Sequence, residues 1–246
     1  MTDTSYLDCS RGRRLAYRHL PGTGPTLVFL PGYMSDMAGG KATALFDWAG
    51  AQGRACLLLD YSGCGLSSGD FADQTIGGWA DDVLTLIAAL VEGPVVLVGS
   101  SMGGWLMLLA GQVLVAQGRL AGLVGIAAAP DFTEWGTTAE QKAELAAGRT
   151  VFEENPYGPE PTPTHARLWA DGQARRVLDA GPIPIDCPVR LLHGQADPDV
   201  PWELSLRIAA LLRSADVQVT LIKDGDHRLS RDGDIALLLR TVAALP

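Results

Sequence analysis

The run from Pro94 to Trp105 constrains the fold of this 246-residue chain more than any other stretch. It begins with four consecutive apolar residues at 95–98, Val-Val-Leu-Val, in which β-branched side chains predominate. Such a run predicts a short strand that is buried on both faces, as strands of a parallel sheet are. Residues 105–115 are rich in Leu, Met, Ala and Gln, which favour a helix. A sharp turn must therefore join a buried strand to a helix.

That turn carries Gly99, Ser101 and Gly103, which match the pattern G-x-S-x-G. In this pattern a serine occupies strained backbone between a strand and a helix, and its hydroxyl is presented as a nucleophile. Side chains at Gly99 or Gly103 would collide with the neighbouring strand and helix, so we expect both positions to require glycine. A glycine-rich turn in an ordinary α/β protein is the alternative, because the pattern also occurs by chance. Ser101 is the candidate nucleophile.

Two loops farther along the chain supply partners for this serine. Residues 189–193 predict a strand, and the loop after it holds Asp197 and Asp199. A carboxylate there could orient a histidine ring, and we choose Asp197 over Asp199 for this role. Of the four histidines, His227 is the one in a polar loop just after the predicted terminal strand. His227 is therefore the candidate general base.

A glycine loop near the amino terminus is the candidate oxyanion site. Residues 26–30 predict a buried strand that runs into Pro31, Gly32 and Tyr33. A loop of this kind can present a backbone N–H to a developing oxyanion. We assign that role to the N–H of Tyr33, together with the N–H of Met102. An ordinary β-to-α turn is the alternative for this loop.

The rest of the chain alternates between predicted strands and helices. Strands are expected at 15–19, 26–30, 55–59, 95–98, 120–128, 189–193 and 217–222, and helices at 40–53, 76–91, 105–115, 201–212 and near the C-terminus. The turn at 21–25 suggests that the first two strands form an opening hairpin. The glycine-rich loop 60–67 is expected to shape the floor of the site. This alternation predicts an α/β fold with a mostly parallel twisted sheet flanked by helices, as a single domain over 1–246.

A different pattern interrupts the alternation at about 131–188, where prolines cluster and two short helical pieces are predicted near 138–147 and 165–180. We predict a small helical cap here, inserted after the sixth strand. Its larger apolar side chains could pack the cap onto the sheet or line an apolar pocket, and the sequence leaves both open. They are Phe132, Trp135, Phe152, Tyr157, Leu168 and Trp169. The predicted substrate-binding set is Phe132, Trp135, Phe152 and Trp169.

Charge and composition restrict the partners of the chain. The formal net charge is −9 and no block is rich in Lys or Arg, which argues against nucleic acid or an anionic membrane as a partner. No apolar run approaches the length of a membrane span, and residues 1–5 lack a secretory pattern, so we expect a cytoplasmic protein without an integral membrane segment. The four cysteines lack metal-ligand spacing and are expected to be reduced and structural. A catalytic cysteine is the alternative.

Several stretches together resemble the α/β-hydrolase superfamily from residue 15 to about residue 245. They are 29–35 (FLPGYMS), 60–63 (DYSG), 98–108 (VGSSMGGWLML), 187–194 (CPVRLLHG) and 226–228 (DHR). The order Ser101, Asp197, His227 is also the serine, acid, histidine order of that family. Within it, the stretches resemble the mitochondrial palmitoyl-protein thioesterases that also act as acyl-glucuronide esterases. The likeness fades at 131–183, and without an evident transit peptide we expect a bacterial-type relative.

The resemblance implies a serine esterase or thioesterase that forms an acyl-enzyme, with S-depalmitoylation of proteins as the expected activity. Ser101 would attack an ester or thioester carbonyl, His227 would move the proton, and Asp197 would orient the imidazole, without a metal or an organic cofactor. A carboxylesterase or acyl-glucuronide esterase is one alternative. A non-catalytic binding protein is another, although it predicts a broken triad. An aspartate-nucleophile dehalogenase or epoxide hydrolase is disfavoured by the serine at position 101.

Overall fold

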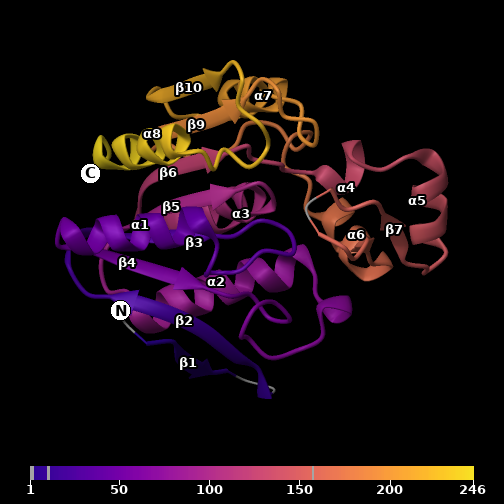
Figure 1. The fold of residues 1–246 in the computed structure, drawn as a ribbon, viewed down its shortest axis with the longest axis horizontal. Helices are drawn as coiled ribbons and strands as arrows, with labels where there is room; N and C mark the ends of the chain where they lie inside the picture. Colours follow the sequence, from indigo (N-terminus) through magenta and orange to yellow (C-terminus); the bar gives the residue numbers. More distant parts are fainter. Residues whose placement is uncertain (1–2, 10–11, 157) are drawn as a thin grey trace.

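The computed structural model describes residues 3–9, 12–156 and 158–246. Met1, Thr2 and the predicted cap residue Tyr157 lie outside the described residues. Within these ranges an eight-stranded sheet has the order β1-β2-β4-β3-β5-β6-β9-β10 (Figure 1). The strands are β1 (Ser5–Asp8), β2 (Arg14–Leu20), β3 (Thr23–Leu30), β4 (Arg54–Leu59), β5 (Val95–Ser100), β6 (Leu120–Ile126), β9 (Val189–Gly194) and β10 (Val217–Ile222). From β4 to β10 every neighbouring pair is parallel, which confirms the predicted sheet.

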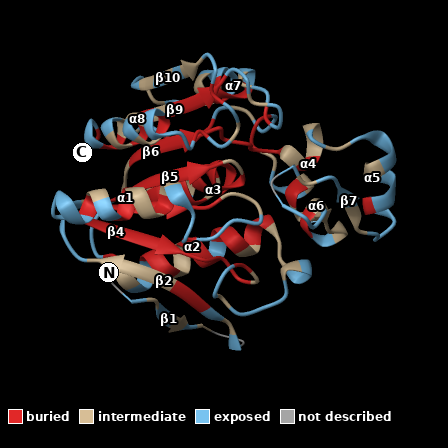
Figure 2. Ribbon diagram, in the orientation of Figure 1, coloured by how far each residue is buried: buried red, intermediate tan, exposed pale blue. Residues whose placement is uncertain are grey.

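Helices cover both faces of this sheet and create two hydrophobic cores. The helices are α1 (Gly40–Ala51), α2 (Ile76–Leu90), α3 (Met102–Ala116), α7 (Glu203–Leu211) and α8 (Asp232–Ala243). Buried residues of α1 and α8 belong to one core, and those of α2, α3 and α7 belong to the other. Along β5, Val95 and Leu97 enter one core while Val96 and Val98 enter the other. Burial on both faces explains the unbroken apolar run of this strand, which is red throughout in Figure 2.

The opening of the chain differs from the prediction. β2 and β3 do not form a hairpin, because β4 lies between them, antiparallel to β2 and parallel to β3. The connection from β2 to β3 passes close to the start of β4, where a Cβ on Gly22 would lie 2.3 Å from the carbonyl carbon of Arg54. All but the first residue of β4 are buried, so this strand takes an interior position. The hairpin that does form joins β2 to β1, a short and mostly exposed strand.

Between β6 and β9 the chain leaves the sheet. This segment contains α4 (Phe132–Trp135), α5 (Ala139–Ala146), α6 (Ala166–Ala174) and a separate antiparallel pair, β7 (Val151–Glu153) with β8 (Thr162–Thr164). These elements lie together beyond the end of the sheet toward which the parallel strand arrows point (Figure 1). The sequence predicts the two longer helices, but strands of three residues are too short to leave a pattern.

The predicted helix 165–180 ends early, at Ala174, because the chain after it is used to anchor the insertion. The buried carboxylate of Asp131 accepts hydrogen bonds from the backbone N–H groups of Val177 and Leu178, at 2.8–3.1 Å. These N–H groups bond to a side chain instead of continuing a helical ladder. The two ends of the insertion are thereby held together at its base.

The surroundings of the cysteines bear on the alternative of a catalytic cysteine, and the helices bear on the expectation that the chain has no membrane segment. Cys9, Cys56, Cys64 and Cys187 are all free thiols. Burial raises the pKa of all four, to about 12 for Cys56 and Cys64 and to about 11 for Cys187. A thiol that resists ionisation is a weak nucleophile at neutral pH, so a catalytic cysteine is disfavoured. Throughout the described ranges, no helix has both the length and the apolar character to cross a membrane.

Candidate active site

Ser101 occupies the turn between β5 and α3 with φ 53° and ψ −120°, a strained conformation for a residue with a side chain. The glycines around it are required sterically, as predicted. A Cβ on Gly99 would lie 2.4 Å from the carbonyl oxygen of Gly103, and a Cβ on Gly103 would lie 2.0 Å from the carbonyl oxygen of Leu30. The sharp turn that holds Ser101, here called the elbow, can therefore form only because neither of these two positions carries a side chain.

The structure brings the three predicted catalytic side chains together. Oγ of Ser101 lies 3.1 Å from Nε2 of His227, and Nδ1 of His227 lies 2.9 Å from Oδ2 of Asp197. Both distances are within hydrogen-bond reach, as required for a base that takes the proton of a nucleophile and for a carboxylate that orients the base. The residues follow β5, β9 and β10, and the carboxyl ends of parallel strands meet at one edge of the sheet.

Asp197 is the most constrained of the three. Its side chain is fully buried. Oδ1 accepts the backbone N–H groups of Asp199 and Val200 at 2.8 and 2.9 Å. Burial alone would raise the pKa of Asp197, but hydrogen bonds from His193 and His227 outweigh it and hold the pKa well below its usual range. An ionised Asp197 keeps the His227 proton on Nδ1, which leaves Nε2 free to accept the Ser101 proton.

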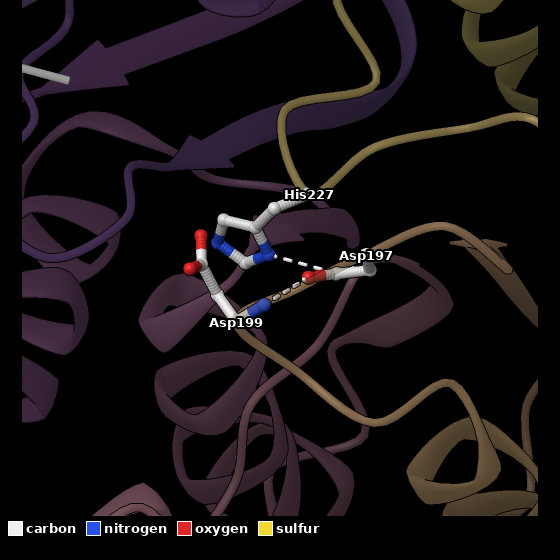
Figure 3. A group of neighbouring side chains, drawn as sticks. All are labelled: Asp197, Asp199 and His227. Atoms are coloured by element: carbon white, nitrogen blue, oxygen red, sulfur yellow. Dashed lines mark hydrogen bonds and ion pairs between the residues drawn. The ribbon is translucent and has the colours of Figure 1, made fainter. Parts of the chain in front are cut away.

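Asp199 lies close to Asp197 and His227, but Asp197 is the carboxylate that contacts Nδ1 of His227. Its backbone N–H bonds to Asp197, while its exposed carboxylate lies on the other side of the His227 ring (Figure 3). Asp197, Asp199 and His227 offer ligand atoms within 4.8 Å of one another, and within the described ranges they are the group at metal-ligand spacing. Since His227 and Asp197 already bond to each other, a cation would compete with the contact that orients the base.

The candidate oxyanion loop lies against the elbow. A Cβ on Gly32 would be 3.4 Å from Cβ of Ser101, an ordinary van der Waals distance, so the loop lies directly beside the nucleophile. Across the described ranges, neither the Tyr33 nor the Met102 N–H donates to a protein acceptor. Unpaired buried N–H groups are rare, and that of Met102 is at the positive end of α3. Two donors are therefore available to a negatively charged oxygen beside Ser101.

Residues of the loop 60–67 form hydrogen bonds with the oxyanion loop and the segment that follows it. The phenol of Tyr61 donates to the carbonyl of Pro31 at 3.0 Å. The buried carboxylate of Asp60 accepts the N–H groups of Met37 and Leu66 at 2.7 and 2.8 Å. These bonds tie the segment after β4 to the segment after β3, which fixes the backbone that presents Tyr33.

The side chain of Tyr33 links the oxyanion loop to the cap. Its O–H donates to the carbonyl of Pro163 in β8 at 2.6 Å. Its ring centroid lies 5.7 Å from that of Phe132, and the Phe132 centroid lies 5.6 Å from that of Trp105 in the elbow helix α3. The structure therefore places Phe132, one of the four predicted substrate-binding residues, beside the catalytic loops.

The other three predicted substrate-binding residues have different surroundings. The indole N–H groups of Trp135 and Trp169 donate to the backbone carbonyls of Pro130 and Thr133, at 2.7 and 3.1 Å. Phe152 is 63% exposed on β7. A role in lining a substrate pocket stays a prediction for all four, with Phe132 best placed for it.

Sequence reasoning missed two residues that support the site. His193 lies fully buried behind Asp197. Lys41, at the start of α1, donates through Nζ to the carbonyl of Arg228, next to His227, and its burial lowers its pKa to about 8. Lys41 carries no motif and is distant in sequence from His227. His193 stands directly before the glycine that opens the acid loop, which is the one local signal that could have found it.

A protein-family model described as the alpha/beta hydrolase family matches residues 27–236. Together with the sheet order and the elbow, this match shows that the chain belongs to the α/β hydrolase family, and it is a hydrolase. Individual proteins within the family are also similar to this chain. Human "Palmitoyl-protein thioesterase ABHD10, mitochondrial" is 38% identical over 244 residues, which cover 98% of this chain and 79% of that protein. The mouse protein of the same name is 39% identical over 241 residues, covering 97% and 80%.

Solved structures agree with these relatives. Mouse alpha/beta hydrolase domain-containing protein 10 superposes with a TM-score of 0.90 at 38% identity, covering 98% of this chain and 97% of that one. A hydrolase structure from Agrobacterium vitis S4 has a TM-score of 0.92 at 39% identity, covering 98% of each chain. Est1E from Butyrivibrio proteoclasticus, solved with ferulic acid, has a TM-score of 0.78 at 20% identity over 97% and 96%, which supports the fold alone.

Replacing the nucleophile is expected to abolish turnover. Ser101→Ala should lower kcat by several orders of magnitude, because it removes the hydroxyl that would form the acyl-enzyme. Ser100→Ala is the matched control, since it removes the same hydroxyl from the adjacent, buried position in β5 and should be mild. Hydrolysis of a short p-nitrophenyl ester measures both, with circular dichroism to verify folding. Equal losses in the two variants would contradict the assignment.

The two loop aspartates are expected to differ sharply. Asp197→Asn should lower kcat by about 10⁴-fold, because an amide favours the wrong histidine tautomer. Asp199→Asn keeps the backbone N–H that Asp197 needs and should cost much less. Steady-state kinetics on the same ester compares the two, and a larger loss for Asp199→Asn would reverse their roles.

Proposed function

We propose that this protein hydrolyses acyl thioesters or esters through an acyl-enzyme on Ser101, and that acylated proteins of the palmitoyl thioester type are its substrate class. The observation that carries the proposal is the continuous contact from Ser101 through His227 to Asp197, at 3.1 and 2.9 Å. The substrate class draws support from the thioesterase relatives, which are 38% identical over 98% of this chain.

The reaction begins when Nε2 of His227 accepts the hydroxyl proton of Ser101 and Oγ bonds to the substrate carbonyl carbon. The carbonyl oxygen becomes an oxyanion that accepts hydrogen bonds from the N–H groups of Tyr33 and Met102. When the carbon–sulfur or carbon–oxygen bond breaks, the leaving group takes the proton from His227. Water then attacks the acyl-enzyme while His227 accepts one of its protons, and His227 returns that proton to Oγ of Ser101 as the carboxylic acid departs.

A short-chain carboxylesterase or acyl-glucuronide esterase is the second candidate. It is favoured by the surroundings of the cap aromatics, because Trp135 and Trp169 are engaged with cap backbone and Phe152 is turned outward. Such residues could stabilise the cap without leaving room for a long acyl chain. That nucleic acid is not a partner stays a prediction. A cytoplasmic location also stays a prediction, and fractionation of the source cells can test it.

The leaving atom distinguishes the two candidates. A palmitoyl thioester and an oxyester with the same acyl group and matched leaving-group size should be compared below their micelle-forming concentrations. We expect a higher kcat/KM for the thioester by at least about tenfold, a difference of 1.4 kcal/mol in transition-state binding. Equal rates, or faster oxyester cleavage, would favour the carboxylesterase. No Ser101-dependent cleavage of either substrate would overturn the proposed function.

Chain length tests the substrate pocket. If Phe132 contributes to an acyl-binding surface, each added methylene should strengthen transition-state binding by about 0.8 kcal/mol, or about fourfold in kcat/KM, until the surface is full. Phe132→Ala should flatten this dependence, while Phe152→Ala, at an exposed position, should affect it less. An acyl thioester series from C2 to C16 measures it. A flat profile in the unmodified protein would exclude the long-chain pocket.

A further inference from the structure

A second histidine lies behind the catalytic carboxylate. His193, at the end of β9, is fully buried, and its Nε2 lies 3.3 Å from Oδ2 of Asp197. The same nitrogen lies 3.1 Å from the carbonyl oxygen of Val200. On the other side of the ring, Nδ1 lies 2.7 Å from Oγ of Ser205 in α7, which is also buried. Each polar atom of this ring therefore faces a specific partner in the interior.

These contacts determine the tautomer of His193. Both neighbours of Nε2 are acceptors, a backbone carbonyl and a carboxylate, so Nε2 must carry the proton. In the neutral ring Nδ1 is then an acceptor, and the hydroxyl of Ser205 is the donor that satisfies it. Ser205 thus holds the ring in the form that donates toward Val200 and Asp197.

Asp197 needs this donor because its two oxygens are held differently. Oδ1 accepts two backbone N–H groups from its own loop. Oδ2 faces two imidazoles, His227 on the solvent side and His193 on the core side. Since His227 must be free to gain and lose a proton during turnover, His193 is the partner of Oδ2 that stays constant.

The acid loop is also joined to the base loop through backbone. The N–H groups of Gln195 and Ala196 donate to the carbonyls of Ile222 and Gly225, at 2.8 and 3.0 Å. A Cβ on Gly194 would lie 2.1 Å from the Gly225 oxygen, so the two loops are in close contact. The backbone positions the loops and holds Oδ1 of the Asp197 carboxylate. The other oxygen, Oδ2, is held by the side chains that face it.

We infer that His193, held in one tautomer by Ser205, is a positioning residue that holds the Asp197 carboxylate in the orientation required by His227. This inference rests on the proposed function for its kinetic readout. The competing explanation is that His193 only fills space in the core, and it makes different predictions for variants that keep the ring volume.

Three variants separate the two explanations. His193→Phe keeps an aromatic ring and removes both nitrogens. His193→Gln places an amide nitrogen near the position of Nε2 and can still donate. Ser205→Ala leaves His193 in place and removes the donor to Nδ1, and it serves as a second test if His193→Phe folds poorly. Circular dichroism and thermal unfolding verify the fold of each.

We expect kcat of His193→Phe to fall by about 10- to 100-fold with KM nearly unchanged, as for loss of an outer partner of a catalytic group. His193→Gln should recover most of this loss, and Ser205→Ala should show a smaller fall. A carboxylate that is no longer held facing Nδ1 stabilises the His227 imidazolium less, so the acid limb of the kcat/KM profile should move to lower pH in His193→Phe. The exposed Asp199 carboxylate near His227 is unchanged in all three variants.

If His193 only fills space in the core, the variants should give different kinetic results. His193→Phe would then keep its kcat and its acid limb, or His193→Gln would lose as much activity as His193→Phe, and either result overturns the inference. An acid limb that moves to higher pH also overturns it.

A spectroscopic readout keeps this inference separate from the proposed function. Imidazole nitrogen NMR of the whole protein reports which ring atom of His227 carries the proton. We expect Nδ1–H in the unmodified protein and a mixture of tautomers in His193→Phe. If no acyl substrate is turned over, the proposed function fails and this spectrum alone decides the inference. An unchanged His227 tautomer in His193→Phe would contradict it.

Discussion

The site depends on compensating one buried negative charge. The Asp197 carboxylate is removed from water, and it remains ionised because backbone N–H groups and two imidazoles surround it. Those donors come from β9, from the acid loop itself and from the loop after β10. Solvating the charge with protein groups therefore fixes the relative positions of these segments. The same contacts direct Nε2 of His227 toward Ser101.

The second constraint is the contact between the oxyanion loop and the cap. Tyr33 supplies a candidate oxyanion donor through its backbone and bonds to Pro163 of the cap through its phenol. Its ring packs against Phe132, at the start of the same insertion. Tyr33 therefore connects the cap directly to the oxyanion loop.

The sequence predicts what depends on local chemistry and misses what depends on distant packing. The β5 run and the glycines around Ser101 are visible because burial on both faces and close backbone approach restrict residue type directly. The opening hairpin was wrong because the place of β4 in the sheet is decided by burial across the whole molecule. His193 was missed because its partner Ser205 lies on a helix whose packing no local pattern reveals.

The proposed function requires turnover to proceed through an acyl group bonded to Ser101. The most direct measurement mixes the protein with an acyl thioester, stops the reaction within milliseconds by acid, and locates the added mass by peptide mass spectrometry. We expect one acyl group per chain, on the peptide that contains Ser101 and absent from Ser101→Ala. An acyl group on a cysteine peptide, or thiol release without any covalent adduct under conditions that trap acyl-enzymes, would contradict it.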